Sequence, residues 1–272
     1  MVKMLFISLL SVCALYGNEK AEKKTPVSFS YYHMTAERLD IDIVNSYPQS
    51  VIEFISMENP YDIVVRTFSA HEDCNRRERV ESAVLRPRGY AAGYPEEVRK
   101  YLESTSLIQC DSPAIRAIAD SLADYHKGLS ENLVRILKWV SSRIAFDKEL
   151  ANKISAGEVN TQSALTTLER GKGTCSEYTN LFAAIMRNLG VPTRFIVGVI
   201  SENGHRIYHA WAECYIEGAG WHGVDPQTAQ LWIPAMGIKL FAGKDFMDCR
   251  IDRLPDIKAA VENLKYSEEN PQ

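Results

Sequence analysis

Three side chains that together could carry out nucleophilic catalysis occur in the second half of the chain: Cys175, His209 and Asp225. A cysteine thiol can attack an acyl carbon, usually an amide carbonyl, and form a thioester. A histidine beside it withdraws the thiol proton and later protonates the leaving amine, while an acidic side chain orients the imidazole and stabilises its charged form. These residue types predict cysteine-dependent acyl chemistry if the fold brings them together.

The segment around Cys175 favours a reactive thiol. Gly171 and Gly173 end one element, and an apolar pattern with helical spacing begins at about Thr174 and stops at residues 190–192, Gly-Val-Pro. Cys175 is therefore expected at a helix N-terminus, where the helix dipole favours the thiolate over the thiol. The loop glycines let backbone N–H groups approach a reacting carbonyl, as an oxyanion hole requires. The spacing of a phosphate-binding loop is absent.

His209 and Asp225 fall on two neighbouring strands of a predicted hairpin. Residues 208–216 and 221–225 are predicted as strands, with turn residues between them and Pro226 after them. Opposed positions in an antiparallel pair sum to a constant, and a loop of three or five residues makes that sum even. The numbers 209 and 225 also have an even sum, so such a loop puts both residues on one face, opposite or diagonal. A two-residue loop without a bulge would put them on different faces.

Two further histidines are rival bases. His205 adjoins an Asn-Gly turn, and His222 is an odd number of positions from Asp225, hence on the other face of its strand. Both are predicted to be surface residues.

Several residues near the three are candidates for contact with a substrate. Thr174 precedes the nucleophile, and Trp211 and Trp221 lie on the predicted hairpin, where they could wall a cleft or simply belong to the core. Trp139 could donate a hydrogen bond to an oxyanion, although an aromatic residue on a helix face usually packs in the core.

The elements that must position these residues can be predicted from periodicity. A β-rich N-terminal region is expected over residues 27–95, with strands at 39–44, 51–55 and 62–66 and a turn-rich linker at its end. Helices are expected at 96–102, from Ser112-Pro113 to about His126, and from Ser130 onward. The catalytic region with its leading helices is expected to span 96–245. A C-terminal helix at 251–264, with a frayed tail, completes residues 246–272.

The N-terminus resembles a targeting segment. Lys3 precedes a short apolar run, so residues 1–17 are predicted to be a signal peptide for export to the periplasm or the exterior, followed by a linker at 18–26. The run is too short to span a bilayer. The residues before Cys13 match a bacterial lipoprotein box poorly, so a lipid anchor at Cys13 is an alternative to the signal peptide. A second alternative is a buried N-terminal strand or helix.

Composition excludes some classes of function. The 272 residues are 46% hydrophobic and 24% charged, with a formal net charge of −4, which is typical of a globular protein and not of a nucleic-acid binder. No two cysteines form a C-x-x-C pair, so a structural zinc site is not expected, and no motif predicts a cofactor. The oligomeric state is not predicted. The cysteines other than Cys175 could pair or stay buried: Cys74, Cys110, Cys214 and Cys249.

Four separate blocks, in this order, resemble the transglutaminase-like superfamily: Gly171-Lys-Gly-Thr-Cys175-Ser-Glu-Tyr178, Arg187-Asn-Leu-Gly-Val-Pro-Thr-Arg194, His209-Ala-Trp211 and Gly220-Trp-His-Gly-Val-Asp225-Pro226. The resemblance implies an α+β, papain-like fold of helices packed on an antiparallel sheet. It also implies that Cys175, His209 and Asp225 are nucleophile, base and orienting acid. Animal cross-linking members usually have Trp after the nucleophile, where this chain has Ser176. The paired C-x-x-C zinc ligands of peptide N-glycanase relatives are absent.

Three hypotheses for function follow. The first is an exported cysteine-dependent hydrolase or acyltransferase that acts on peptide-type amides of a protein or cell-wall peptide, with hydrolysis favoured because of Ser176. The second is a catalytically silent binding or scaffold module that retains the fold. The third is a structural exported protein in which Cys175 is disulfide-bonded, to Cys214 or another cysteine.

Overall fold

The computed structural model describes residues 29–33, 42–44, 52–56, 62–67, 78–156, 158, 161–202, 205–231, 237–249 and 265–269. The predicted signal peptide at 1–17, the linker at 18–26, Cys13, Cys74 and the helix expected at 251–264 lie outside these residues.

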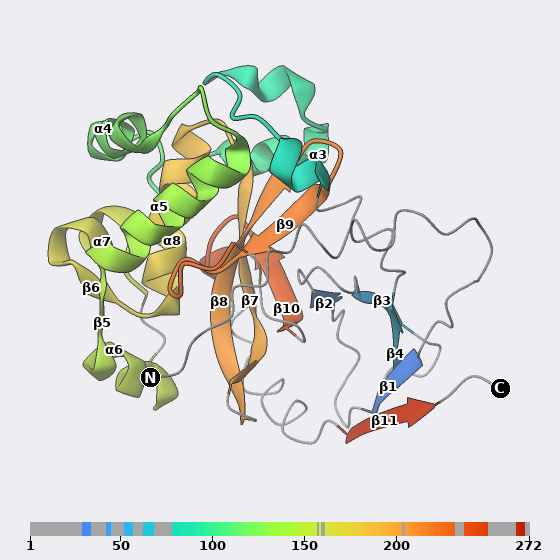
Figure 1. The fold of residues 1–272 in the computed structure, drawn as a ribbon. Helices are drawn as coiled ribbons and strands as arrows, with labels where there is room; N and C mark the ends of the chain where they lie inside the picture. The colour runs from blue at the N-terminus through green and yellow to red at the C-terminus, as the bar shows by residue number, and fades with distance from the viewer. Residues whose placement is uncertain are drawn as a thin grey trace, which may run out of the picture.

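The chain forms a mixed α+β fold, as the sequence predicts (Figure 1). Its α-helices and short 3₁₀ helices are η1 (Tyr90–Gly93), α3 (Glu96–Arg99), η2 (Lys100–Leu102), α4 (Pro113–Leu122), α5 (Leu129–Arg143), α6 (Lys148–Ser155), α7 (Ala164–Arg170), α8 (Cys175–Asn188) and η3 (Met247–Cys249). Its strands are β1 (Phe29–His33), β2 (Asp42–Val44), β3 (Ile52–Ser56), β4 (Asp62–Thr67), β5 (Ala145–Phe146), β6 (Lys172–Gly173), β7 (Thr193–Glu202), β8 (His205–Ile216), β9 (Gly220–Val224), β10 (Gly237–Gly243) and β11 (Lys265–Glu269).

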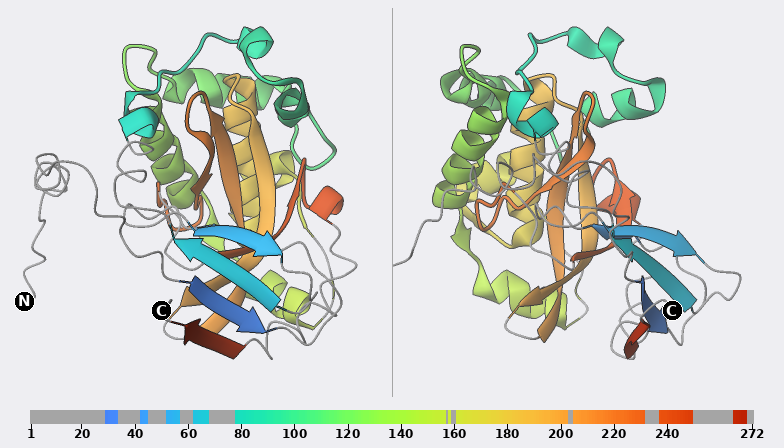
Figure 2. Two further views of the ribbon diagram at one scale, coloured as in Figure 1. Left: turned by 90° about the vertical axis from the view of Figure 1, so that its right-hand side faces the viewer. Right: turned by 45° about the vertical axis from the view of Figure 1, so that its right-hand side comes forward.

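Three sheets organise these strands. The largest has the order β2-β10-β7-β8-β9, with every neighbouring pair antiparallel. A second antiparallel sheet has the order β11-β1-β4-β3, so strands from both ends of the chain lie side by side in it (Figure 2). The third is the short parallel pair β5-β6, of which β6 immediately precedes α8 in the sequence.

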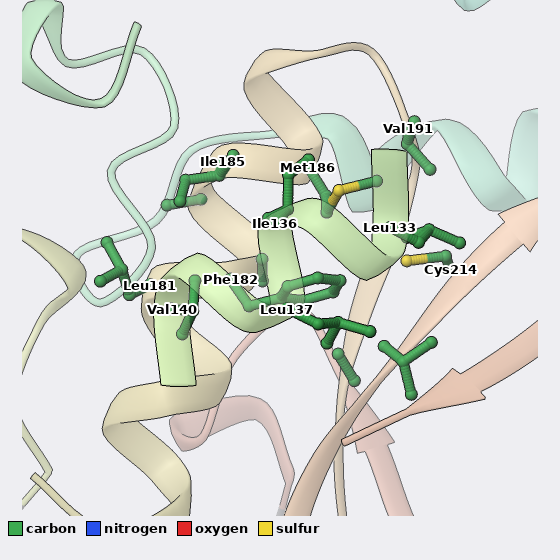
Figure 3. Packing of buried hydrophobic residues seen from close by; sticks show 14 of the residues in the cluster. Leu133, Ile136, Leu137, Val140, Leu181, Phe182, Ile185, Met186, Val191 and Cys214 are labelled. Atoms are coloured by element: carbon green, nitrogen blue, oxygen red, sulfur yellow. The ribbon is translucent and has the colours of Figure 1, made fainter. Parts of the chain in front are cut away.

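The core lies between the largest sheet and helices α5 and α8. Apolar residues at helical spacing on both helices are buried against each other and against Cys214 of β8 (Figure 3): Leu133, Ile136, Leu137 and Val140 of α5, and Leu181, Phe182, Ile185 and Met186 of α8. Residues 176–187 of α8 are all buried, polar ones included. A helix enclosed on every side is a fixed support for the residue at its N-terminus.

Arg187 ties the other end of α8 to the surrounding chain. Its guanidinium is buried, and it donates to the backbone carbonyls of Thr193 (2.9 Å), Glu103 (2.8 Å) and Lys244. Burial lowers the pKa of this guanidinium to about 10. A buried charge is tolerated when its donors are satisfied, so this residue of the second motif block has a structural role.

The helix expected from Ser112 to about His126 ends earlier, at Leu122. Ser112 does cap it, by accepting a hydrogen bond from the N–H of Ala114. Beyond Leu122, the side chain of Asn132 on α5 accepts from the N–H of Asp124 (2.8 Å) and donates to its carbonyl (2.9 Å). The side-chain amide of Asn132 thus supplies the backbone of Asp124 with the hydrogen bonds that a longer α4 would have provided, and the helix ends before this residue.

The boundaries of the terminal regions also differ from expectation. The strands predicted near 39–44, 51–55 and 62–66 are present as β2, β3 and β4, but β2 pairs with β10 in the largest sheet, and residues 78–93 contain helical turns. Residues 265–269 form β11 and pair with β1, where a frayed tail was expected. A periodic pattern predicts a strand and does not name its partner, because pairing is a long-range contact.

Replacing Phe182 by Ala should reduce the free energy of unfolding by about 3–5 kcal/mol, because the ring is fully buried between α5, α8 and the sheet. Urea denaturation followed by circular dichroism measures the change. Met247→Ala, at a side chain that is 72% exposed, is the matched control and should change the value by less than about 0.5 kcal/mol. Similar losses for both variants would contradict this account of the core.

Candidate active site

Cys175 is the first residue of α8, and Thr174 is its extended N-cap. The thiol is partly exposed and free. The parallel pair β5-β6 holds the preceding turn, because the N–H of Ala145 donates to Gly171 (2.8 Å) and the N–H of Asp147 donates to Gly173 (2.9 Å). The helix N-terminus expected from the sequence is therefore present, and its position is set by backbone hydrogen bonds on the strand before it.

The buried carboxylate of Glu177 holds the turn that carries the nucleophile. One oxygen accepts from the N–H and the hydroxyl of Thr174 (2.7 and 2.8 Å), and the other accepts from the hydroxyl of Thr161 (3.0 Å) and the N–H of Gln162 (2.7 Å). A carboxylate at this position also interacts favourably with the helix dipole. Glu177 therefore joins the first turn of α8 to the segment at 161–162.

Gly173 is required by the close approach of Glu177. A Cβ at residue 173 would lie 2.3 Å from the Cβ of Glu177, a distance too short for two carbon atoms that are not bonded to each other. Only glycine fits at this position. Gly171, the C-cap of α7, has a φ of +65°, in the left-handed region that favours glycine. Glycine is thus required at the two positions for different reasons: close packing at residue 173 and backbone conformation at residue 171.

The hairpin that carries His209 and Asp225 has the register that the parity argument requires. Ile216 pairs with Gly220 and Ala212 pairs with Val224, so the loop between β8 and β9 consists of residues 217–219. A three-residue loop puts 209 and 225 on one face, in diagonal positions. His209 Nε2 lies 2.9 Å from Asp225 Oδ2, and both side chains are buried. The geometric expectation is confirmed.

The two partners of His209 set its charge state. Burial favours the neutral imidazole, but the hydrogen bond and charge of Asp225 and those of Cys175 outweigh it and raise the pKa of His209 to about 10. Burial likewise acts to raise the pKa of Asp225, and its bonds to His209, Thr228 and Gln227 overcome that effect and lower it. Because Nε2 faces Asp225, Nδ1 is the ring nitrogen that remains for the hydrogen bond to Cys175. His209 is therefore held as an imidazolium between Asp225 and Cys175.

Trp211 and Trp221, the two candidates for a cleft wall, have different environments. Trp211 is fully buried and stacks beside His209, with ring centroids 6.5 Å apart and planes at 24°. Trp221 pairs with Tyr215, about 20 Å along β8 from His209, and contacts the rings of Tyr215 and Tyr101. The structure thus brings Trp211 to the three residues as a packing neighbour, and it does not bring Trp221 there.

The remaining candidates are placed as follows. The prediction that His222 is a surface residue is wrong: it is fully buried, with Nε2 2.8 Å from the carbonyl of Leu231, because its face of the hairpin packs into the core beside Cys214. His205 begins β8, and its side chain lies outside the described part. Thr174 is buried with its hydroxyl bonded to Glu177, and Trp139 packs partly buried against the core.

The four described cysteines are all free, which contradicts the disulfide hypothesis for Cys175 and Cys214. Cys110, Cys214 and Cys249 are buried, and burial raises the pKa of each thiol, to about 12 for Cys214. Among these four, Cys175 alone combines partial exposure with a neighbouring imidazole.

Sequence reasoning missed two buried acids, Glu177 beside the nucleophile and Glu213 on the strand that carries His209. Glu177 carried a recognisable signal, because Thr174-x-x-Glu177 is a capping-box pattern at a helix start. Glu213 lies on the same face of β8 as His209 and is bonded to Arg194 (2.6 Å) and Lys239 (3.4 Å). No local pattern indicates this group of three side chains, since its members come from three different strands.

The described residues contain neither a candidate metal site nor a helix able to span a membrane. No group of three or more His, Cys, Asp or Glu side chains in these ranges is arranged to hold a metal ion. Within the same part of the chain, every helix is too short or too polar to cross a bilayer.

Comparison with known proteins agrees with this site. The family model of the transglutaminase-like superfamily matches residues 116–226, which include Cys175, His209 and Asp225. Residues 116–226 are therefore similar to the transglutaminase-like superfamily. A curated relative, the uncharacterized protein ML0607 of Mycobacterium leprae, is 22% identical over 142 residues, which cover 49% of this chain and 47% of that protein. This chain thus matches about half the length of that relative.

Solved structures resemble this chain in fold. A crystal structure from Cytophaga hutchinsonii, described as a "putative cysteine protease", has a TM-score of 0.51 and 16% identity, covering 90% of this chain and 89% of that one. The periplasmic domain of TgpA from Pseudomonas aeruginosa, bound to ethylmercury, has a TM-score of 0.42 and 15% identity, covering 76% of this chain and 92% of that one. At these identities the likeness concerns the fold.

Glu177→Gln should destabilise the protein by about 3 kcal/mol and slow the alkylation of Cys175, because an amide NH₂ would face hydrogen-bond donors that now meet a carboxylate. Thermal unfolding and iodoacetamide kinetics measure the two effects. Glu169→Gln, the same change at an exposed position on α7, should leave both unchanged. Unaltered stability in Glu177→Gln would contradict the role given to this carboxylate.

His209 should remain positively charged at pH 8, where an ordinary histidine is neutral, because its pKa is raised to about 10. Nitrogen NMR of ¹⁵N-histidine protein reports the imidazole charge as pH rises. Asp225→Asn, which removes the carboxylate charge, should move the titration midpoint of His209 downward. A neutral imidazole at pH 8 in the unaltered protein would contradict the charged state assigned to His209.

Proposed function

We propose that this protein hydrolyses peptide-type amide bonds through a thioester on Cys175. The observation that carries the proposal is the contiguous arrangement of the three side chains: Asp225 Oδ2 lies 2.9 Å from His209 Nε2, and the thiol of Cys175 hydrogen-bonds to the same imidazole. This is the order nucleophile, base and orienting acid that acyl transfer through cysteine requires.

In the proposed first half-reaction, the Cys175 sulfur attacks the amide carbonyl carbon and a C–S bond forms. The imidazolium of His209 then donates its proton to the amide nitrogen, the C–N bond breaks, and the amine leaves. Asp225 stays ionised and holds the ring. In the second half-reaction, water attacks the thioester while His209 takes its proton. The C–S bond then breaks, which releases a carboxylic acid product and restores the cysteine.

The start of α8 offers stabilisation for the developing oxyanion. The first N–H groups of a helix have no partner inside it. The N–H groups of Glu177 and Tyr178 already bond to the carbonyl of Thr174. Those of Cys175 and Ser176 are the remaining ones beside the sulfur, and we assign them the oxyanion in the proposed reaction.

Hydrolysis is proposed over amine transfer because of residue 176. Cross-linking members usually carry Trp after the nucleophile, whereas Ser176 is a small side chain, 5% exposed, that packs into the base of α8. It therefore presents no aromatic surface at the sulfur to shelter the thioester from water. The substrate class we propose is a protein or a cell-wall peptide, and the N-terminal sequence supports export as the route by which the protein meets it.

The test uses casein and a digest of cell-wall peptides, each in H₂¹⁸O with a primary amine present. Hydrolysis places ¹⁸O in new carboxyl groups, and amine transfer places the amine there instead; mass spectrometry distinguishes the two. Cys175→Ser and His209→Ala should each reduce turnover by roughly 10³-fold or more. Ser142→Ala, an exposed change on α5, should retain activity.

Two results would overturn the proposal. Amine incorporation in place of ¹⁸O would assign the site to acyl transfer. No turnover and no acyl-enzyme on either substrate, with Cys175 free and rapidly alkylated, would favour the non-catalytic binding module.

A further inference from the structure

The turn that follows β9 fixes the carboxylate of Asp225 through both oxygens. Oδ2 faces His209, while Oδ1 accepts from the N–H of Gln227 (2.9 Å) and that of Thr228 (3.4 Å). Asp225 and Gln230 close the turn by exchanging backbone hydrogen bonds of 2.9 and 3.0 Å. Ala229 in this turn has a φ of +56°, an uncommon conformation for a residue with a side chain. Local strain of this kind persists only where the surroundings enforce it.

One side chain outside the turn holds it from the core. Ser141 on α5 donates its hydroxyl hydrogen to the carbonyl of Gln227 at 2.9 Å. That carbonyl belongs to the same peptide unit as the N–H of Thr228, which donates to Asp225 Oδ1. A peptide that accepts at its oxygen is polarised and becomes a stronger donor at its nitrogen. A hydrogen-bonded path therefore runs from α5 through one peptide group to the carboxylate that faces His209.

The bond of Ser141 is unusual for its place in a helix. A serine within a helix commonly bonds to a carbonyl of its own preceding turn. The neighbouring Ser142 does so, by donating to the carbonyl of Trp139 (2.9 Å). Ser141 donates outward, to a residue 86 positions away. Because α5 is packed in the core along its apolar face, this contact ties the turn to a rigid element.

We propose that Ser141 is a positioning residue for Cys175, His209 and Asp225: through the peptide between Gln227 and Thr228, it orients the Asp225 carboxylate toward His209 and thereby keeps the imidazole in place beside Cys175. The inference deepens the proposed function and rests on its assignment of the three residues. Pro226 supports the arrangement, since its missing N–H cannot compete for Oδ1 and its ring restricts the backbone at the start of the turn.

The test compares the rate of Cys175 alkylation by iodoacetamide at pH 6 and pH 9 in the full chain and in Ser141→Ala, Ser141→Thr and Ser142→Ala. At pH 9 an ordinary thiol is largely ionised without assistance, whereas at pH 6 reactivity depends on the imidazolium. The ratio of the pH 6 rate to the pH 9 rate should fall about fivefold in Ser141→Ala, the effect expected of one neutral hydrogen bond. Ser141→Thr, which keeps the hydroxyl, should restore the ratio, and Ser142→Ala should match the unaltered protein.

Circular dichroism at both pH values must show Ser141→Ala folded, because an unfolded chain presents an ordinary thiol and would by itself lower the ratio. An unchanged ratio in Ser141→Ala, even with a lower melting temperature, would overturn the inference, as would a ratio that falls in Ser141→Ala and is not restored by threonine. Alkylation requires no substrate. A protein without amide turnover but with a ratio that depends on the hydroxyl of Ser141 would disprove the proposed function and leave the positioning role standing.

Discussion

The arrangement of Cys175, His209 and Asp225 depends on keeping a charged imidazole buried. His209 is only 8% exposed, and burial by itself favours its neutral form. The carboxylate of Asp225 and the thiol of Cys175 reverse that preference, which they can do only while both stay within hydrogen-bonding reach. An unpaired charge at such a site would be costly, so the fold must hold three side chains from α8, β8 and the end of β9 in fixed positions.

Each of the three is held by support of a different kind. Cys175 is placed by a helix enclosed in the core, whose first turn is bonded through Glu177 to Thr161 and Gln162 and whose last turn is bonded through Arg187. His209 lies within β8, the only strand of its sheet that pairs with both β7 and β9 among the described residues. Asp225 lies in a turn closed by its own backbone and tied to α5. Rigid support of this kind lets catalytic groups meet a substrate without reorganising first.

How much could be predicted from the sequence depends on the range of the interactions involved. Helix α8 and the β8-β9 hairpin were predicted closely, because helical spacing, alternation and turn residues act over a few positions. The end of α4 was predicted too late, since Asn132 of another helix decides it. The pairing of β2 with β10 and of β11 with β1 was not predicted, because many strands have suitable edges and the chain must close long loops to choose among them.

The sequence by itself determined the identities and order of Cys175, His209 and Asp225, the helix start beneath the sulfur, and the parity that puts the last two on one strand face. These follow from backbone periods of 3.6 and 2, which are local properties. Only the tertiary structure decided that His222 is buried, that Trp211 rather than Trp221 lies beside His209, and that Glu177 and Ser141 hold the cluster. Burial and long-range hydrogen bonds depend on which surfaces meet, and that is settled when helices and sheet pack together.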